Sequence, residues 1–235
     1  MKNYILSVTG ILLSISVFCQ SSGEFNNSAY IKSSSGDYNG AILDYNKAIE
    51  VDPKNTMAYN GRANTYLNLK NYYGAIQDCN KAIELNSKNE KAYSCRGYAH
   101  ECLNNYNNAI LDFNRAIELN PNDINYYYSR GNCKASLLDF RGSILDYNKV
   151  IELDPNYVGA YFNRGLSKRN LKDLIGAIQD FNKVITLLPK DPEAYYWRGA
   201  SKLLLNQKDS ACFDFSKAGE LGYAEAYEMI KNNCN

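Results

Sequence analysis

Apolar residues return three and four positions apart along this chain, in short stretches that alternate with polar ones. Tyr59, Ala63 and Tyr66 follow this spacing in one stretch, and Cys79 and Ala82 follow it in the next. Residues at these intervals lie on one face of an α-helix. The polar stretches between them are typical of turns. The pattern therefore predicts a series of amphipathic helices joined by short turns.

The helical pattern repeats with a period of 34 residues, and single residues recur in register with it. The period divides most of the chain into repeats 22–55, 56–89, 90–123, 124–157, 158–191 and 192–225. The recurring residues are Tyr59, Tyr93, Tyr127, Tyr161 and Tyr195, then Arg62, Arg96, Arg130, Arg164 and Arg198, then Asp44, Asp78, Asp112, Asp146, Asp180 and Asp214. A period of this length indicates a small helical unit stacked on copies of itself, which usually creates an extended binding surface.

Small residues recur in the first predicted helix of each repeat, and prolines follow many of the second helices. Ala63 and Gly97 are examples of the small residues, which allow two helix backbones to approach closely. Pro53 and Pro121 each end one helix and lead into the next. Together with the period, these features resemble the tetratricopeptide repeat family over residues 36–222. The resemblance implies an all-α fold, a right-handed α-solenoid of stacked antiparallel helix pairs with a short C-terminal capping helix.

The two ends of the array depart from the repeat. Ser28 and Lys32 stand where an apolar helix is expected, so residues 20–35 are either a poorly matching N-terminal segment or a frayed first helix. Residues 223–235 lack the proline of the other repeats and are predicted to form a capping helix and tail. End repeats are commonly altered because they cover an otherwise exposed apolar face.

Residues 1–19 resemble a secretory signal peptide. Residues 1–4 carry one positively charged side chain, residues 5–18 are mostly apolar, and cleavage is expected near Cys19. The apolar run is too short for a comfortable membrane span, which needs about 20 residues. Export to the periplasm or the outside is therefore the favoured interpretation. Lipidation at Cys19 and an uncleaved anchor stay open as alternatives.

The charge balance gives no reason to expect nucleic acid or an anionic membrane as a partner. The chain has 26 Lys and Arg residues against 25 Asp and Glu residues. Cleavage after Cys19 removes one lysine and no acid, so the mature chain is expected to be near neutral. Both kinds of partner are captured by clustered positive charge. We expect a monomer without an integral membrane span after cleavage, whose partner is another protein or a peptide.

Export also places the cysteines in an oxidising compartment. We expect a disulfide between Cys212 and Cys234. Cys212 stands where the other repeats have isoleucine, and Cys234 returns to it if the capping helix folds back after Gly222. The remaining cysteines lack metal-ligand spacing, and His100 is the only histidine. We expect neither a metal nor a cofactor.

A ladder of charged residues is expected inside the array. The arginine and the aspartate of each repeat lie at similar height in an antiparallel helix pair, so bidentate bridges between them are sterically reasonable. The ladder comprises Arg62, Arg96, Arg130, Arg164 and Arg198 with Asp78, Asp112, Asp146, Asp180 and Asp214. We expect a structural role, with pairing inside each repeat favoured over pairing to the following repeat. An asparagine recurs as Asn46, Asn80, Asn114, Asn148 and Asn182, and it is expected to satisfy neighbouring groups rather than a ligand.

The partner-binding face follows from the family resemblance, which implies that first helices line a concave groove. Residues at the groove positions vary from repeat to repeat, as expected for a surface that fits a non-repeating partner. The candidate groove residues are Asn60, Asn64, Tyr98, Glu101, Tyr128, Asn132, Phe162, Arg169 and Tyr196. Aromatic and arginine side chains dominate the energy of many interfaces. In the competing interpretation, Phe162 and Tyr196 pack on adjacent helices and only their edges reach solvent.

The sequence offers no catalytic constellation. It contains no glycine-rich phosphate loop, and the recurring aspartates belong to the ladder. We therefore predict a non-enzymatic protein–protein interaction scaffold that binds a peptide segment or helix of a partner in the groove. The first alternative is a structural, envelope-organising protein without a discrete ligand. A glycan-binding protein or an enzyme that uses the aromatic groove is less favoured.

Overall fold

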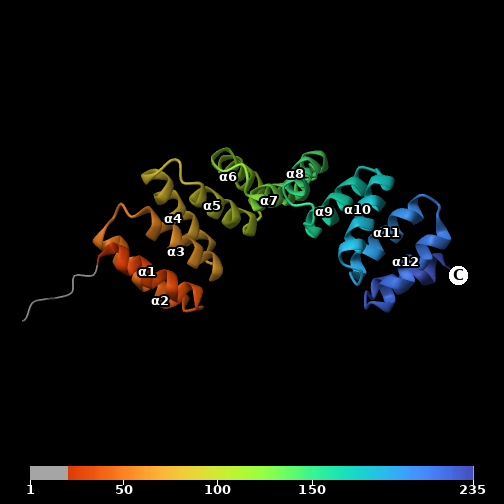
Figure 1. The fold of residues 1–235 in the computed structure, drawn as a ribbon, viewed down its shortest axis with the longest axis horizontal. Coiled ribbons are helices and arrows are strands. Elements are labelled where there is room, and N and C mark those ends of the chain that lie inside the picture. Colours follow the sequence, from red (N-terminus) through yellow and green to blue (C-terminus); the bar gives the residue numbers. More distant parts are fainter. Residues whose placement is uncertain (1–20, 235) are drawn as a thin grey trace, which may run out of the picture. The chain divides into compact units, whose positions relative to one another are not determined.

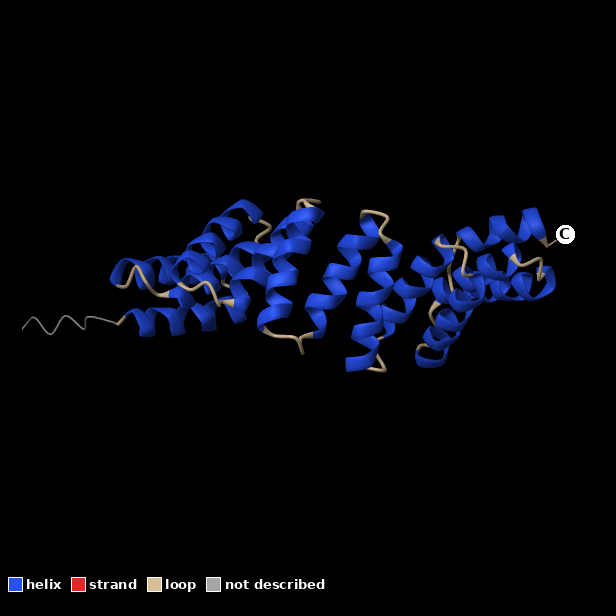
Figure 2. Ribbon diagram, turned by 90° about the horizontal axis from the view of Figure 1, so that it is seen from above, coloured by secondary structure: helices blue, strands red, loops and turns tan. Residues whose placement is uncertain are grey.

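Every regular element in the described part of the chain is an α-helix (Figures 1 and 2). The structure is a computed structural model that describes residues 21–234. The expected signal peptide, residues 1–19, lies outside the described residues. The helices group into two compact units that divide between Ser87 and Lys88.

The N-terminal unit holds two helix pairs, and the C-terminal unit holds four pairs and a final helix. The N-terminal unit contains α1 (Ser22–Ser34), α2 (Tyr38–Val51), α3 (Thr56–Asn68) and α4 (Tyr72–Leu85). The C-terminal unit contains α5 (Glu90–Cys102), α6 (Tyr106–Leu119), α7 (Ile124–Ser136), α8 (Phe140–Leu153), α9 (Val158–Asn170), α10 (Leu174–Leu187), α11 (Pro192–Leu204), α12 (Lys208–Glu220) and α13 (Glu225–Asn233). Within each unit, every helix packs on the next one along the chain. This stacking of consecutive helix pairs confirms the all-α solenoid expected from the repeat.

In the core of most repeats, a ring on the second helix fits against a small residue on the first, and Cys79 takes the place of the ring in repeat 56–89. A Cβ atom added to Gly97 would lie 3.0 Å from Phe113, and one added to Gly165 would lie 3.0 Å from Phe181. Phe113 and Phe181 are fully buried. Glycine therefore lets the two backbones approach closely enough for the ring to fill the space between them.

A residue in the left-handed conformation closes the turn between the two helices of a repeat. Gly36 takes this place in the first repeat with φ of +88°. Non-glycine residues occupy it in the others, with φ between +58° and +66°: Lys70, Asn104, Leu138, Lys172 and Asn206. The backbone N–H of the next residue then bonds back to the first helix, as from Asn71 to the carbonyl of Tyr66 at 2.8 Å. These turns fold each helix pair back on itself.

Helix α1 is formed, so the helix pairs begin at Ser22 rather than after residue 35. Its N-terminus carries a capping box, in which the Ser21 hydroxyl accepts from the N–H of Glu24 at 3.2 Å and the Glu24 carboxylate accepts from the N–H of Ser21 at 2.8 Å. The polar residues that suggested fraying share one buried partner. Ser28 and Lys32 each donate a 2.6 Å hydrogen bond to the Asp44 carboxylate.

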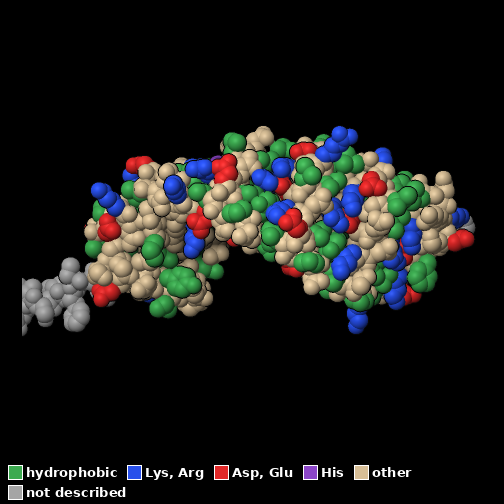
Figure 3. Space-filling model, turned by 45° about the horizontal axis from the view of Figure 1, so that its top comes forward, with side chains coloured by type: hydrophobic (Ala, Val, Ile, Leu, Met, Phe, Trp, Pro, Cys, Tyr) green, Lys and Arg blue, Asp and Glu red, His purple; other side chains and the backbone are tan. Residues whose placement is uncertain are grey.

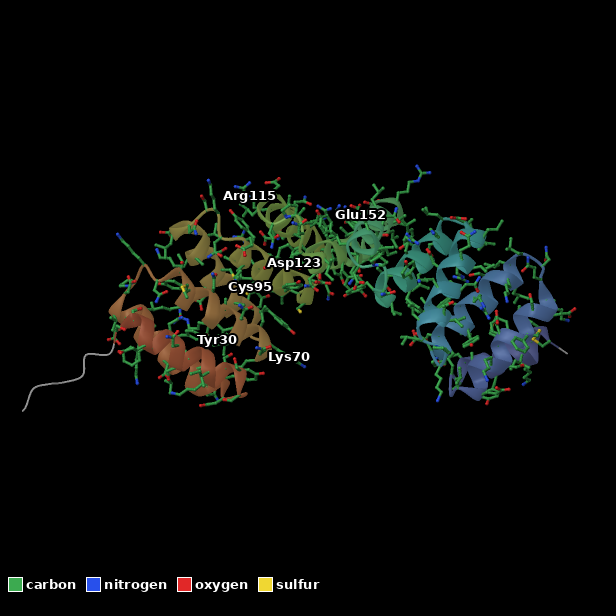
Figure 4. All side chains as sticks on the ribbon, viewed as in Figure 1. Tyr30, Lys70, Cys95, Arg115, Asp123 and Glu152 are labelled. Carbon is green, nitrogen blue, oxygen red and sulfur yellow. A yellow bond between two sulfur atoms is a disulfide. The ribbon has the colours of Figure 1, made fainter. Side chains whose placement is uncertain are left out.

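Charged side chains of both signs are intermixed on the face seen in Figure 3. Pairs one helical turn apart account for part of this pattern in the C-terminal unit. Arg115 pairs with Glu118 at 2.6 Å, and Lys149 pairs with Glu152 at 2.6 Å. Arg115 and Glu152 stand at the outer rim of α6 and α8 (Figure 4). Exposed pairs of this kind contribute little to stability.

Candidate partner-binding site

The charged ladder pairs each arginine with the aspartate of its own repeat. Arg96 places Nε 2.9 Å and Nη2 2.6 Å from the two carboxylate oxygens of Asp112, which is a bidentate bridge. The same geometry holds Arg62 to Asp78, Arg130 to Asp146, Arg164 to Asp180 and Arg198 to Asp214. The aspartates are buried. Asp44 has no arginine in its repeat, and Lys32 and Ser28 serve it instead.

The recurring asparagine receives the remaining nitrogen of the next arginine. Nη1 of Arg130 lies 2.7 Å from Oδ1 of Asn114, and Nη1 of Arg198 lies 2.8 Å from Oδ1 of Asn182. Each of these guanidinium groups therefore joins two successive repeats. Ser216 replaces asparagine in the last repeat, which no further arginine follows. The ladder residues are thus engaged with one another and hold neighbouring repeats in register.

The four candidate groove rings lie between core and surface. Each is half-buried, with one side against the aromatic ring of the second helix in its own repeat. The ring centroids are 5.1 Å apart for Tyr98 and Phe113, 6.0 Å for Tyr128 and Tyr147, 5.8 Å for Phe162 and Phe181, and 5.7 Å for Tyr196 and Phe215. Contacts at these distances support the core. The four rings are therefore partly packed in the core and partly exposed.

A hollow of about 300 Å³ opens across the first helices α7, α9 and α11. Tyr128 and Phe162 provide its aromatic walls. Its other lining residues are Val158, Gly159, Asn163, Asp191, Pro192 and Glu193. Gly159 makes room for the Tyr128 hydroxyl, because a Cβ atom at this position would lie 2.8 Å from that oxygen. Burial raises the pKa of Tyr128, so its hydroxyl stays a neutral hydrogen-bonding group.

A second hollow of about 300 Å³ adjoins the first and shares Asn163 with it. Nδ2 of Asn163 donates to the Tyr128 hydroxyl at 3.0 Å and to Oδ1 of Asn132 at 3.0 Å. The Tyr147 hydroxyl also donates to Oδ1 of Asn132, at 2.8 Å. Amide and hydroxyl groups from three helices therefore form one network beside two hollows. We call Tyr128, Asn132, Phe162, Asn163 and Glu193 the α7–α9–α11 site.

The other sequence-predicted groove residues lie elsewhere. Asn60 and Asn64 belong to α3 in the N-terminal unit. Glu101 lies on α5, where burial raises the pKa of its carboxyl to about 7 against a hydrogen bond with Ser129 that lowers it. The ring centroid of Tyr196 lies 4.8 Å from that of Tyr223, and the ring also contacts Phe215, so Tyr196 packs at the C-terminal cap.

Sequence reasoning missed Asn163, Gly159 and Glu193. The signal was present, because the sixth position of the repeat varies as much as the fifth and ninth. It holds Gly61, Cys95, Ser129, Asn163 and Trp197 in successive repeats. Only the structure shows that Asn163 ties Tyr128 to Asn132.

Among the described residues, no three His, Cys, Asp or Glu side chains lie close enough together to hold a metal ion. His100 is half-buried on α5, and its Nδ1 has no hydrogen-bond partner in the described part of the chain. Burial lowers the pKa of this histidine. Among the helices of residues 21–234, none has the length and apolar character needed to cross a membrane.

The structure places Cys212 of α12 beside Cys234, which follows α13, with their Cα atoms 5.7 Å apart, within the range that a disulfide requires. The four other cysteines in the described residues take no part in a disulfide. Cys79, Cys95 and Cys133 are buried, and Cys102 is exposed. Burial raises the pKa of Cys133 to about 12, so this thiol is unreactive at neutral pH.

Solved structures of similar fold include two that are described as TPR or tetratricopeptide repeat proteins. The chain is 27% identical to the MamA protein, with a TM-score of 0.67, and the match covers 72% of this chain and 92% of that one. It is 25% identical to a tetratricopeptide repeat protein from Parabacteroides merdae, with a TM-score of 0.61 and coverage of 91% and 84%. YrrB, described as a TPR protein with an unusual peptide-binding site, is 23% identical with a TM-score of 0.73 and coverage of 80% and 97%, which shows the fold alone. No curated protein matches the chain.

Family models match consecutive parts of the sequence. One TPR repeat model matches residues 29–70, and three tetratricopeptide repeat models match residues 57–89, 90–123, 124–157 and 146–179. Together these matches cover more than half of the chain without a gap. They agree with the helix pairs and with the 34-residue period. The chain belongs to the tetratricopeptide repeat family.

Proposed function

We propose that this chain is a non-enzymatic interaction scaffold that binds a peptide segment or helix of another protein at the α7–α9–α11 site. The hollow across these three first helices carries the proposal. Its walls are residues that differ from one repeat to the next, whereas the core and ladder residues recur. Membership of a family whose members bind proteins and peptides supports the same conclusion.

The chemistry of the site suits a polypeptide ligand. A volume of about 300 Å³ is at the lower end for ligand pockets, so it accommodates one or two side chains rather than a whole small molecule. Tyr128 and Phe162 offer apolar contact to such side chains. The hydroxyl and amide groups of Tyr128, Asn132 and Asn163 offer hydrogen bonds to a peptide backbone.

We also propose that the protein is exported and that its C-terminal cap is oxidised. The signal-like pattern of residues 1–19 supports export. The placement of Cys212 and Cys234 supports a structural disulfide, which persists in oxidising compartments.

A filled hollow tests the proposed function. Gly159→Leu directs a side chain toward the Tyr128 hydroxyl and obstructs the hollow without removing a core residue. Gly23→Leu is the matched control, because it makes the same helical substitution in α1 where the nearest contact of a new Cβ is 3.8 Å away. Peptides are selected from a displayed random 12-residue library on the wild-type chain, and their dissociation constants are measured by fluorescence anisotropy.

We expect the selected peptides to bind Gly159→Leu about tenfold or more weakly than wild type, and to bind Gly23→Leu as tightly as wild type. A tenfold loss of affinity corresponds to about 1.4 kcal/mol, which is close to the free energy of burying one apolar side chain. Circular dichroism confirms that both variants are folded. The proposal fails if the library yields no binding peptide, or if Gly159→Leu binds the selected peptides as tightly as Gly23→Leu does.

A further inference from the structure

Arg169 and Trp197 form a pair that the repeat does not require. At the position of Arg169 the other repeats have Leu67, Glu101, Ala135 and Leu203. At the position of Trp197 they have Gly61, Cys95, Ser129 and Asn163. Trp197 is the only tryptophan of the chain. Two departures from the repeat thus meet on neighbouring first helices, α9 and α11.

The guanidinium of Arg169 stacks on the indole but has no anionic partner in the described residues. Its Cζ lies 5.0 Å from the centroid of the Trp197 ring. Its Nε is buried and lacks a hydrogen-bond acceptor. Arg164, on the same helix, is fully engaged by comparison, with Nε 2.9 Å from Asp180 and Nη1 2.6 Å from Asn148.

An arginine in this state is prepared for an anion. Stacking on an aromatic face fixes the plane of the guanidinium, so little side-chain freedom is lost when its donors are used. The structure shows no hydrogen bond or ion pair at Nη1 and Nη2 of Arg169 within residues 21–234, so these donors are left for a ligand oxygen. The geometry matches a carboxylate, which accepts two parallel N–H bonds from an arginine. A doubly charged phosphate needs a further cation, and the adjacent Lys168 is committed to Asp180 at 2.8 Å.

The position of Arg169 relates it to the α7–α9–α11 site. Phe162 and Arg169 are seven residues apart, so they lie on the same face of α9, about 10 Å apart along its axis. An extended peptide covers this distance in roughly three residues. One segment can therefore place an apolar side chain in the hollow and a second side chain at Arg169.

We propose that Arg169, held on Trp197, receives an aspartate or glutamate side chain of the partner segment, roughly three residues from an apolar side chain that enters the hollow. The proposal rests on the proposed function and specifies the chemistry of the partner. It makes Arg169 a specificity-determining residue beside a hollow whose lining includes the acidic Asp191 and Glu193 and no basic side chain.

The test compares peptide selections on three forms of the chain: wild type, Arg169→Gln and Arg141→Gln. Arg141 is an exposed arginine of α8 for which the structure shows no ion pair, so its loss is a matched change of charge. Wild type and Arg141→Gln are expected to enrich Asp or Glu at one fixed peptide position, and Arg169→Gln is expected not to. Synthetic peptides with amidated C-termini then carry Glu or Gln at that position.

Replacing the peptide Glu by Gln should weaken binding to wild type about tenfold or more, and should change binding to Arg169→Gln by less than about twofold. Peptides that bind without acidic enrichment, yet are weakened by Gly159→Leu, overturn the role of Arg169 and keep the proposed function. The role of Arg169 is also overturned if replacing the peptide Glu by Gln weakens binding to wild type and to Arg169→Gln equally. It is overturned as well if binding requires a free C-terminal carboxylate on the peptide. A library that yields no binder overturns both proposals.

Discussion

At the scale of single residues, the cost of burying a charge explains why the ladder side chains bond to more than one partner. Asp146 has a side chain that is 4% exposed, and it accepts from both Arg130 and Lys134. Arg130 in turn donates to Asn114 of the preceding repeat. An unpaired charge in such a place is strongly unfavourable, whereas a complete network is tolerated. The ladder therefore joins the two helices of a repeat to each other and to the preceding repeat.

Removal of one ladder carboxylate should destabilise the chain strongly. Asp146→Asn keeps the shape of the side chain but leaves Arg130 and Lys134 half-buried without a counter-charge, so we expect a loss of about 3–5 kcal/mol in the free energy of unfolding. Glu152→Gln is the control, because its side chain is 66% exposed and its pair with Lys149 is a surface contact. Urea titrations followed by circular dichroism measure both. Equal effects would show that the ladder has no special structural weight.

Glu101 should make stability depend on pH. Its carboxyl pKa is raised by burial from 4.5 to about 7, so between these values the folded chain binds a proton that the unfolded chain releases. The free energy of unfolding therefore falls as pH rises from about 4.5 to 7 and levels off above it. Glu101→Gln removes this titration. The stability of wild type relative to this variant should decline between pH 5 and pH 8 in thermal melts, while a constant difference would show that Glu101 is solvated.

At the scale of elements, the first and last helices are stabilised in different ways. Helix α1 begins at a capping box and gives Asp44 its partners, although its sequence resembles the other first helices poorly. Helix α13 has no side-chain cap and packs on α12. It buries Ala226 against the last repeat, and Cys234 at its end lies beside Cys212 of α12. A single packed neighbour gives a short helix little independent stability.

The disulfide should stabilise this C-terminal cap. Closing the loop between Cys212 and Cys234 is expected to contribute roughly 3 kcal/mol in the chain-entropy model. Replacing both by serine should therefore lower the melting temperature, and dithiothreitol should do the same to wild type. Cys102→Ser, which changes an exposed free thiol, should have no effect. A non-reduced peptide map that finds both cysteines as free thiols in the exported protein would contradict the disulfide.

At the scale of the whole molecule, recurrence and departure from recurrence separate structure from recognition. The residues that return every 34 positions, such as Arg130 and Asp146, are consumed by contacts within and between repeats. Of the residues that do not return, Asn163 lines the hollow and Arg169 has a buried Nε without an acceptor. A partner with a non-repeating sequence can be distinguished only by the second group.

The sequence alone determined the helices, their pairing and the family. The hydrophobic spacing is a local property, and it recurs in each 34-residue repeat. The sequence also indicated Tyr128, Asn132 and Phe162 as variable groove positions. The tertiary structure decided how these rings divide between core and solvent, because that depends on the ring of the second helix that each contacts. It also decided that Asn163 joins Tyr128 to Asn132 and that Arg169 lies on Trp197. Such contacts join residues about one repeat apart, and their geometry follows from how neighbouring helices pack, which no local pattern encodes.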